Sequence, residues 1–546
     1  MPTRDTSPFD FISPLDSRYY GPEEAFFAAL HPYLSEAATI LYQLRVEQAL
    51  LAELEASGVA PAGTSAALAA ALAADPVTAA EVYAEEERIH HNIRALVNCI
   101  RRRLEASPRA QGFVHLFVTS NDVMDTARAL ALRDVTREVL LPDLHRLMEA
   151  LVGAARRHAD TVQIGRTHGR HAVPLTLGYW LANYVDRLGL RMERIARAAG
   201  DLRGMVSGAV GAHNSFALRW PDDPAAFERR ALARLGLKPA EGGVSTQVVQ
   251  PEFVADFAHA LVSTFSVLAN LADDYRHLMR SEIEELGEKT RRVGSSTMPH
   301  KINPKDFENV KSLWKAAVPR MTTVYMDQIS EHQRDLTNSA SGRFLNELVA
   351  VFAYAVRRLD KAVRATVVSL PALERNFEAG RQWTVAEPLY IALALSGEDD
   401  AYEIAKRLAE ECRDREMGLL DYLHTPEGGK IVDRLAPELQ RVVLDPRRYL
   451  GDSASRTRLV CDLWWGGEAG GEAGTTGAGG GEAGESGESG ETGDAERPRG
   501  RVNPLDRLTA PLAAGPLDAG AAGGASSAGA AGDAQARPSP VPGAMG

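Results

Sequence analysis

Apolar residues recur at steps of three and four along most of the chain, which is the period of an amphipathic helix. The clearest stretch covers residues 253–279, where the stripe is formed by Phe253, Phe257, Leu261, Phe265, Leu268 and Leu271. Similar stretches cover 139–158, 173–199, 308–328 and 344–366. No alternating strand pattern of comparable length competes with them. We therefore expect an all-α fold built on a bundle of long helices.

Breaker-rich segments divide this helical region into three parts. "EASPRAQGF" (105–113) ends a first helical segment, and "SLPALERNFEAGRQW" (369–383) opens a last one. The pattern predicts an N-terminal helical domain (1–110), a central long-helix bundle (111–367) and a C-terminal helical domain (368–465).

After Trp464-Trp465 the composition changes to "GGEAGGEAGTTGAGGGEAGESGESGETGD". Such a segment buries too little apolar surface to offset the entropy lost on ordering. We expect residues 466–546 to form a disordered, mostly acidic tail. A partner-binding role for this tail is the alternative hypothesis.

Charge and cysteine content argue against several classes of protein. The 546 residues carry a net charge of −12 without an isolated basic block, which argues against a nucleic-acid partner. The three cysteines lie far apart, so neither a disulfide framework nor a zinc cluster is expected. The N-terminus lacks the pattern of a signal peptide, and no apolar run predicts a membrane span. We expect a cytoplasmic protein that does not bind a membrane.

The loop "GSSTMPHKINP" (294–304) interrupts the helical pattern with glycine, prolines and polar side chains. Two serines, Lys301 and Asn303 could receive an anion and hold a hydroxyl beside it. A serine acts as a base only where nearby donors and positive charge stabilise its deprotonated form. Taken locally, this hypothesis and an ordinary polar surface loop are about equally supported.

Two further stretches carry candidate chemistry. In "IGRTHGRHAVP" (164–174), His168 could donate a proton to a leaving group. The His168–His171 spacing alone is weak support for a metal, and we expect none. In "FVTSNDVMDTARAL" (117–130), Thr119 and Ser120 precede a helix, where they could cap it or help to bind a carboxylate.

Together these stretches resemble the aspartase/fumarase superfamily, whose hallmark loop GSSxMPxKxNP matches residues 294–304 in full. The resemblance covers roughly residues 12–464 and is strongest to adenylosuccinate lyases. It extends to "SPLDSRY" (13–19), "RTHG" (166–169), "STQ" (245–247), "HQRDLTNSASGR" (332–343) and "AEP" (386–388). By this resemblance the substrate-binding residues are Arg18, Tyr19, His91, Gln247, Arg334, Ser339 and Arg343.

The resemblance also implies a mechanism and an assembly. The reaction would be β-elimination from an N-succinyl substrate, with Ser295 as the base and His168 as the general acid. Lys301 and Asn303 would hold the succinyl carboxylates, helped by Thr119 and Ser120. No cofactor would be needed. The subunits would form a homotetramer in which each site draws on three chains.

Two positions depart from the family pattern near the substrate. Asn92 stands where the family usually has Asp, and Arg170 where it usually has Gln. Adenylosuccinate is the first substrate hypothesis, and another N-substituted aspartate is the alternative. A non-catalytic structural relative is a third hypothesis, against which the presence of Ser295, His168 and Lys301 speaks.

Overall fold

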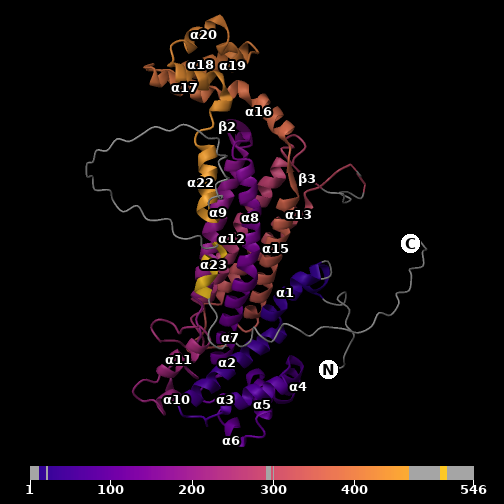
Figure 1. Ribbon diagram of the computed structural model, residues 1–546, viewed down its shortest axis with the longest axis vertical. Coiled ribbons are helices and arrows are strands. Elements are labelled where there is room, and N and C mark those ends of the chain that lie inside the picture. The colour runs from indigo at the N-terminus through magenta and orange to yellow at the C-terminus, as the bar shows by residue number, and fades with distance from the viewer. Residues whose placement is uncertain (1–11, 20–22, 290–296, 299, 467–503, 513–546) are drawn as a thin grey trace, which may run out of the picture.

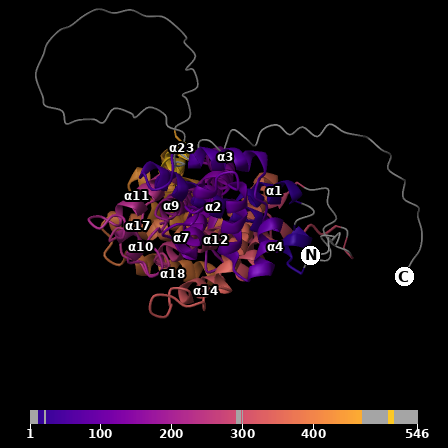
Figure 2. The ribbon, with the colours of Figure 1, turned by 90° about the horizontal axis from the view of Figure 1, so that it is seen from below.

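The computed structural model describes residues 12–19, 23–289, 297–298, 300–466 and 504–512. It is a long helical molecule whose central helices run parallel to its long axis (Figure 1). Figure 2 views the molecule along this axis, with α9 and α12 in the middle of the projection. The predicted all-α class is confirmed.

The N-terminal helices gather at one end of the bundle, the lower end in Figure 1. They are η2 (Leu15–Tyr19), α1 (Glu24–Leu34), α2 (Glu36–Ala56), α3 (Thr64–Ala74), α4 (Ala79–Ile89), α5 (Asn92–Arg103) and α6 (Pro108–Gln111). Their buried side chains belong to the same hydrophobic cluster as those of the bundle.

The bundle is formed by helices, most of them long, that run up and down between its two ends. They are α7 (Ser120–Val135), η4 (Thr136–Leu140), α8 (Leu141–Arg157), α9 (Leu177–Gly200), α12 (Glu252–Leu278), α13 (Lys305–Ala317), α14 (Arg320–Met326) and α15 (Leu345–Ala365). The shorter α10 (Asn214–Ala217), α11 (Ala226–Arg234) and η5 (Ser341–Phe344) lie in the connections. The stretch 308–328, expected to be one helix, is broken at Pro319, which lacks the amide hydrogen that a continuing helix needs.

The core helix α12 shows why the hydrophobic stripe was informative. Phe257, Leu261, Phe265 and Leu268 are all fully buried, and each such side chain stabilises the fold by about 1.5–3 kcal/mol. Phe265 packs edge-on against Phe352 of α15 at 5.7 Å. By length and composition α12 could cross a membrane, contrary to the expectation, but 67% of its apolar window is buried inside the bundle.

Two short antiparallel strand pairs lie at the opposite, upper end. β1 (Val162–Thr167) pairs with β2 (Arg170–Thr176), and β3 (Leu286–Glu288) pairs with β4 (Thr366–Val368). The helix expected from residue 173 therefore begins only at Leu177, after the Thr176 cap. Pro174 explains the difference, since its ring fits an edge strand and not a helix interior.

The C-terminal region forms a separate, smaller hydrophobic cluster. Its helices are α16 (Leu370–Thr384), α17 (Ala386–Leu395), α18 (Ala401–Asp414), α19 (Leu419–Leu423), α20 (Pro426–Val432), α21 (Pro437–Leu444) and η6 (Pro446–Arg448). From there α22 (Ser453–Trp465) returns along α9 and packs on the bundle rather than on this cluster. Trp464 fits against Gly189 of α9, where any Cβ would collide with the indole ring.

Beyond α22 the structure describes one further segment, α23 (Pro504–Thr509) and η7 (Ala510–Leu512). The disorder expected for 466–546 is therefore wrong for residues 504–512. Leu505, Leu508 and Leu512 supply an apolar face that the rest of the tail lacks. The expectation for 467–503 and 513–546 lies outside the described residues.

Candidate active site

The hairpin β1–β2 places His168 at its tip. Thr167 and Arg170 pair directly, so His168 and Gly169 form a two-residue turn. Both have positive φ, 53° and 72°, as the favoured hairpin turn requires. His168 is exposed there, and Arg170 lies beside it at the start of β2. The turn presents the imidazole to solvent on a short, rigid support.

The buried carboxylate of Glu285 anchors this hairpin. Glu285 is 0% exposed and accepts hydrogen bonds from Gln163 (2.7 Å) and Asn376 of α16 (2.9 Å). It also pairs with Arg166 at 2.6 Å. Glu285 directly precedes β3, which leads into the signature loop. One side chain thus connects the His168 hairpin, the C-terminal helices and the strand before the loop.

The signature loop is described only in part. Ser295 lies outside the described residues, as do 290–294, Ser296 and Pro299. Lys301 is exposed, and its amide donates to the Met298 carbonyl at 3.0 Å. Asn303 is half-buried, two residues before α13 begins. Both residues directly precede α13, which lies next to β3 toward the end of the bundle that carries the hairpin (Figure 1).

Thr119 and Ser120 form the start of α7 near the other end. Thr119 is the N-cap of a capping box, and its amide donates to Asp122 at 2.7 Å. The amides of Ser207 and Gly208 donate to the same carboxylate at 2.8 and 3.2 Å. Burial raises the pKa of Asp122 to about 6, while these backbone donors act in the opposite direction. The predicted cap is present, and Asp122 ties it to the 207–208 loop.

Two histidine–glutamate pairs lie near Asp122. His115 lies 2.6 Å from Glu47, and His213 lies 3.0 Å from Glu228. Burial lowers the pKa of His115, but the charge and hydrogen bond of Glu47 outweigh it, so that this pKa is raised. The α7 cap therefore lies on a layer of hydrogen-bonded polar side chains.

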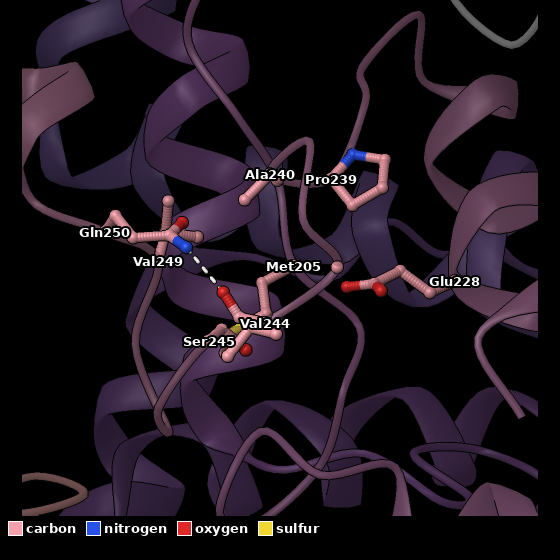
Figure 3. A pocket seen from close by; sticks show the side chains of 10 residues that line it. Met205, Glu228, Pro239, Ala240, Val244, Ser245, Val249 and Gln250 are labelled. Atoms are coloured by element: carbon pink, nitrogen blue, oxygen red, sulfur yellow. Dashed lines mark hydrogen bonds between the residues drawn. The ribbon is translucent and has the colours of Figure 1, made fainter.

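Gln247 and Arg334 meet at this same lower end. The guanidinium of Arg334 donates to the Gln247 side-chain oxygen at 2.9 Å, and the Gln247 amide group donates to the Ala209 carbonyl at 2.8 Å. Residues on either side of Gln247 in the sequence, among them Val244, Ser245 and Gln250, help to line a cavity (Figure 3). Its volume is about 10 Å³. This volume is about that of one water-sized probe, so the cavity is no substrate site.

The remaining predicted binding residues are distributed over neighbouring elements. His91 caps α5 by accepting from the Arg94 amide at 3.2 Å, and the Asn92 side chain contacts the Met124 sulfur at 3.4 Å. Burial raises the pKa of Tyr83, in α4, to about 12, and the charge of Arg343 acts in the opposite direction. The Ser339 amide donates to the Leu336 carbonyl at 3.1 Å.

Tyr19 lies at neither end of the bundle but along its flank. Its ring packs on Tyr354 of α15 with centroids 5.0 Å apart. Arg18 precedes it in the same short η2 helix.

Of the predicted residues that the structure describes, a single subunit therefore does not bring all together. Gln247 comes just before α12 and Glu285 just after it, and the 27 residues of this helix span about 40 Å. His168, Arg170, Lys301 and Asn303 lie at the upper end of the bundle (Figure 1). His91, Asn92, Thr119, Ser120, Gln247 and Arg334 lie at the lower end.

Glu285 is the position of the site region that sequence reasoning missed, and Asp122 was recognised only as part of the helix start. Asp122 stands three residues after the Thr119 cap, a spacing that can signal its contact with the cap amide. Glu285 carries no local signal, because its partners lie on distant segments. Within the described part of the chain, no group of three His, Cys, Asp or Glu side chains is arranged to hold a metal ion.

Comparison with known families decides the assignment. The family model described as "Lyase" matches residues 17–318, and the one described as "Adenylosuccinate lyase C-terminal" matches 330–449. The adenylosuccinate lyase of Archaeoglobus fulgidus is 32% identical, over 82% of this chain and 98% of its own. That of Methanothermobacter thermautotrophicus is 31% identical, over 83% and 98%.

The chain belongs to the adenylosuccinate lyase family. It is accordingly a carbon–nitrogen lyase of this type, and the predicted resemblance is confirmed.

Solved structures share its fold. A fumarate lyase from Mesorhizobium sp. BNC1 superposes with a TM-score of 0.69 at 22% identity, covering 80% of this chain and 97% of its own. The 3-carboxy-cis,cis-muconate lactonizing enzyme of Pseudomonas putida gives 0.67 at 25%, covering 80% and 98%.

Proposed function

We propose that the protein cleaves adenylosuccinate to AMP and fumarate. The observation that carries this proposal is its similarity to curated adenylosuccinate lyases over 98% of their length. The complete GSSxMPxKxNP loop and the Arg–Tyr pair at residues 18–19 support it. The related succinyl-carboxamide ribotide would be cleaved in the same way.

The chemistry explains the residue types. Removing a proton beside a carboxylate builds a second negative charge on the succinyl group, and fixed donors and cations lower this barrier. Ser295 would take the proton, and Lys301 and Asn303 would bind the carboxylates that gain charge. His168 would protonate the departing nitrogen, because an amine anion is too unstable to leave. The substrate supplies both the acidic C–H and the leaving group, so the chain would need no cofactor.

We also propose that the working form is a homotetramer in the cytoplasm. The predicted site residues lie at opposite ends of one subunit, so neighbouring subunits would complete each site. Met326, Ile329 and Leu336 are exposed close to Arg334, an apolar surface that a partner subunit could bury. We expect no nucleic-acid or membrane partner.

A different N-succinyl amine is the second candidate substrate. Arg170 supports it, because this added charge lies two residues from the proposed acid His168 and would favour a more anionic leaving group. Asn92 removes a carboxylate that the family usually has near the substrate. The Arg18–Tyr19 pair favours the nucleotide.

The deciding experiment measures fumarate release. Purified protein is given adenylosuccinate, the succinyl-carboxamide ribotide and a panel of other N-succinyl amines. We expect enzymatic turnover of the nucleotide at a kcat/KM well above that of the panel. Faster turnover of another compound would replace the substrate assignment, and no fumarate from any of them would contradict the proposed activity.

A further inference from the structure

Residues 504–512 lie within the tail and yet contact the bundle. α23 and η7 lie against α8 and α9, beyond the end of α22 (Figure 1). The end-on view places α23 at the outer edge of the molecule (Figure 2). The family models end at residue 449, before both α22 and this segment.

The contact has an apolar face of regular spacing. Leu512 is 0% exposed, and Leu505 and Leu508 pack half-buried against the same hydrophobic cluster. Their positions three and four residues apart place them on one side of a helical segment. The flanking tail is dominated by Gly, Ala, Glu and Ser. The three leucines are therefore what distinguishes this segment from its surroundings.

Polar contacts at both ends fix its register on the bundle. The guanidinium of Arg137, in η4, donates to the Leu512 carbonyl at 2.7 Å. Arg507 forms an ion pair with Glu193 of α9. Asp506 lies near His145 of α8 and acts against the burial that lowers the pKa of this histidine.

The surface of α8 and α9 that residues 504–512 contact is called their seat, and it continues the surface that α22 contacts. The His145 ring packs on Trp465, the last residue of α22, with centroids 4.3 Å apart. His145 is thus in contact with the end of α22 and close to Asp506 of α23. The two segments lie one after the other on the same face of the subunit.

We propose that residues 504–512 are a docking motif by which the tail binds α8 and α9 of its own subunit. The chain leaves α22 at Gly466, whose carbonyl accepts a hydrogen bond from Arg156 of α8, and α23 contacts α8 and α9 as well, so the motif can reach its contact surface within one chain. Such a tether gives a high effective concentration, so a short apolar motif is sufficient. The motif is independent of the proposed lyase site, whose residues lie on other elements.

Cross-linking in the full chain tests the seat directly. The double variant Glu193→Cys/Arg507→Cys is treated with a short bismaleimide; the three native cysteines are buried. The tail offers a matched control, since Pro516-Leu517-Asp518 repeats Pro504-Leu505-Asp506, and Ala519 corresponds to Arg507. We expect the 193–507 cross-link within one chain, in a yield about tenfold above that of Glu193→Cys/Ala519→Cys. Equal yields, or a link between two chains, would overturn the proposal.

Hydrogen exchange gives a second readout. We expect the amides of residues 505–510 to exchange about tenfold faster in Leu508→Asp than in the wild type, because the motif leaves its seat. Leu517→Asp should leave this exchange unchanged, and both variants should release fumarate at the wild-type rate. The same exchange in both variants would show that residues 504–512 do not dock through this face.

Discussion

At the scale of single residues, Ser295 and His168 carry the proposed elimination. Ser295→Ala should lower kcat by about 10³-fold or more and His168→Gln by about 10²–10⁴-fold, because each removes a proton-transfer group. Steady-state fumarate release measures both effects. Ser296→Ala is the matched control and should lose at least tenfold less. Near wild-type turnover in either test variant would remove that residue from its proposed role.

Asp122 should give the stability a specific pH dependence. Its pKa of about 6 lies above the ordinary value of 3.8, so the folded state retains a proton that the unfolded chain releases between these values. Its contribution to the free energy of unfolding is therefore complete below pH 3.8 and is lost as the pH rises through 6. The change amounts to about 3 kcal/mol.

Urea unfolding at a series of pH values measures this dependence. The difference between the wild type and Asp122→Asn should change between pH 4 and 7, because the amide does not titrate. Parallel stability curves of the two proteins over this range would contradict the role given to Asp122.

At the scale of elements, Glu285 holds the His168 hairpin in place. Glu285→Gln should destabilise the fold by about 3 kcal/mol, because Arg166 loses its buried partner. It should also lower kcat more than it raises KM, since the hairpin that carries the proposed acid shifts. Thermal unfolding and fumarate kinetics measure the two effects.

The adjacent Glu284 is the matched control. Its ion pair with Arg375 is exposed, so Glu284→Gln should cost less than about 1 kcal/mol. Equal effects of the two substitutions would contradict the anchoring role given to Glu285.

The long helices were predictable because each has to bury a continuous stripe of side chains. The start of α7 was predictable as well, since Thr119 and Asp122 form a local capping signal. The strands β1 and β2 were not, because six or seven residues carry little periodicity, and β2 also contains Pro174. Glu285 depends on contacts with residues more than ninety positions away, such as Asn376, which no local pattern contains.

The tail shows that average composition can hide a short ordered segment. Its average content predicted disorder for all of 466–546, and this average concealed three leucines at helical spacing. The signature loop could be recognised from its sequence, but Ser295 lies outside the described residues, so its role stays a prediction.

At the scale of the whole molecule, the separation of the two groups of site residues predicts complementation between subunits. Ser295→Ala and Gln247→Ala, each inactive alone, should regain activity when unfolded together and reassembled. An equal mixture should recover about one quarter of the wild-type activity, because a quarter of the sites receive both intact segments. No recovery, although mixed tetramers form, would show that one subunit supplies both segments.

The two connections of the C-terminal helices have a mechanical consequence. The chain enters this region through α16, anchored on the hairpin, and leaves through α22, whose Trp464 is fixed against Gly189. A region held at two points has less freedom than a region on a single linker. The C-terminal helices are therefore restricted to rocking about the line that joins these two attachment points. Since one of these points is the His168 hairpin, each such movement should transmit force to the residue proposed as the acid.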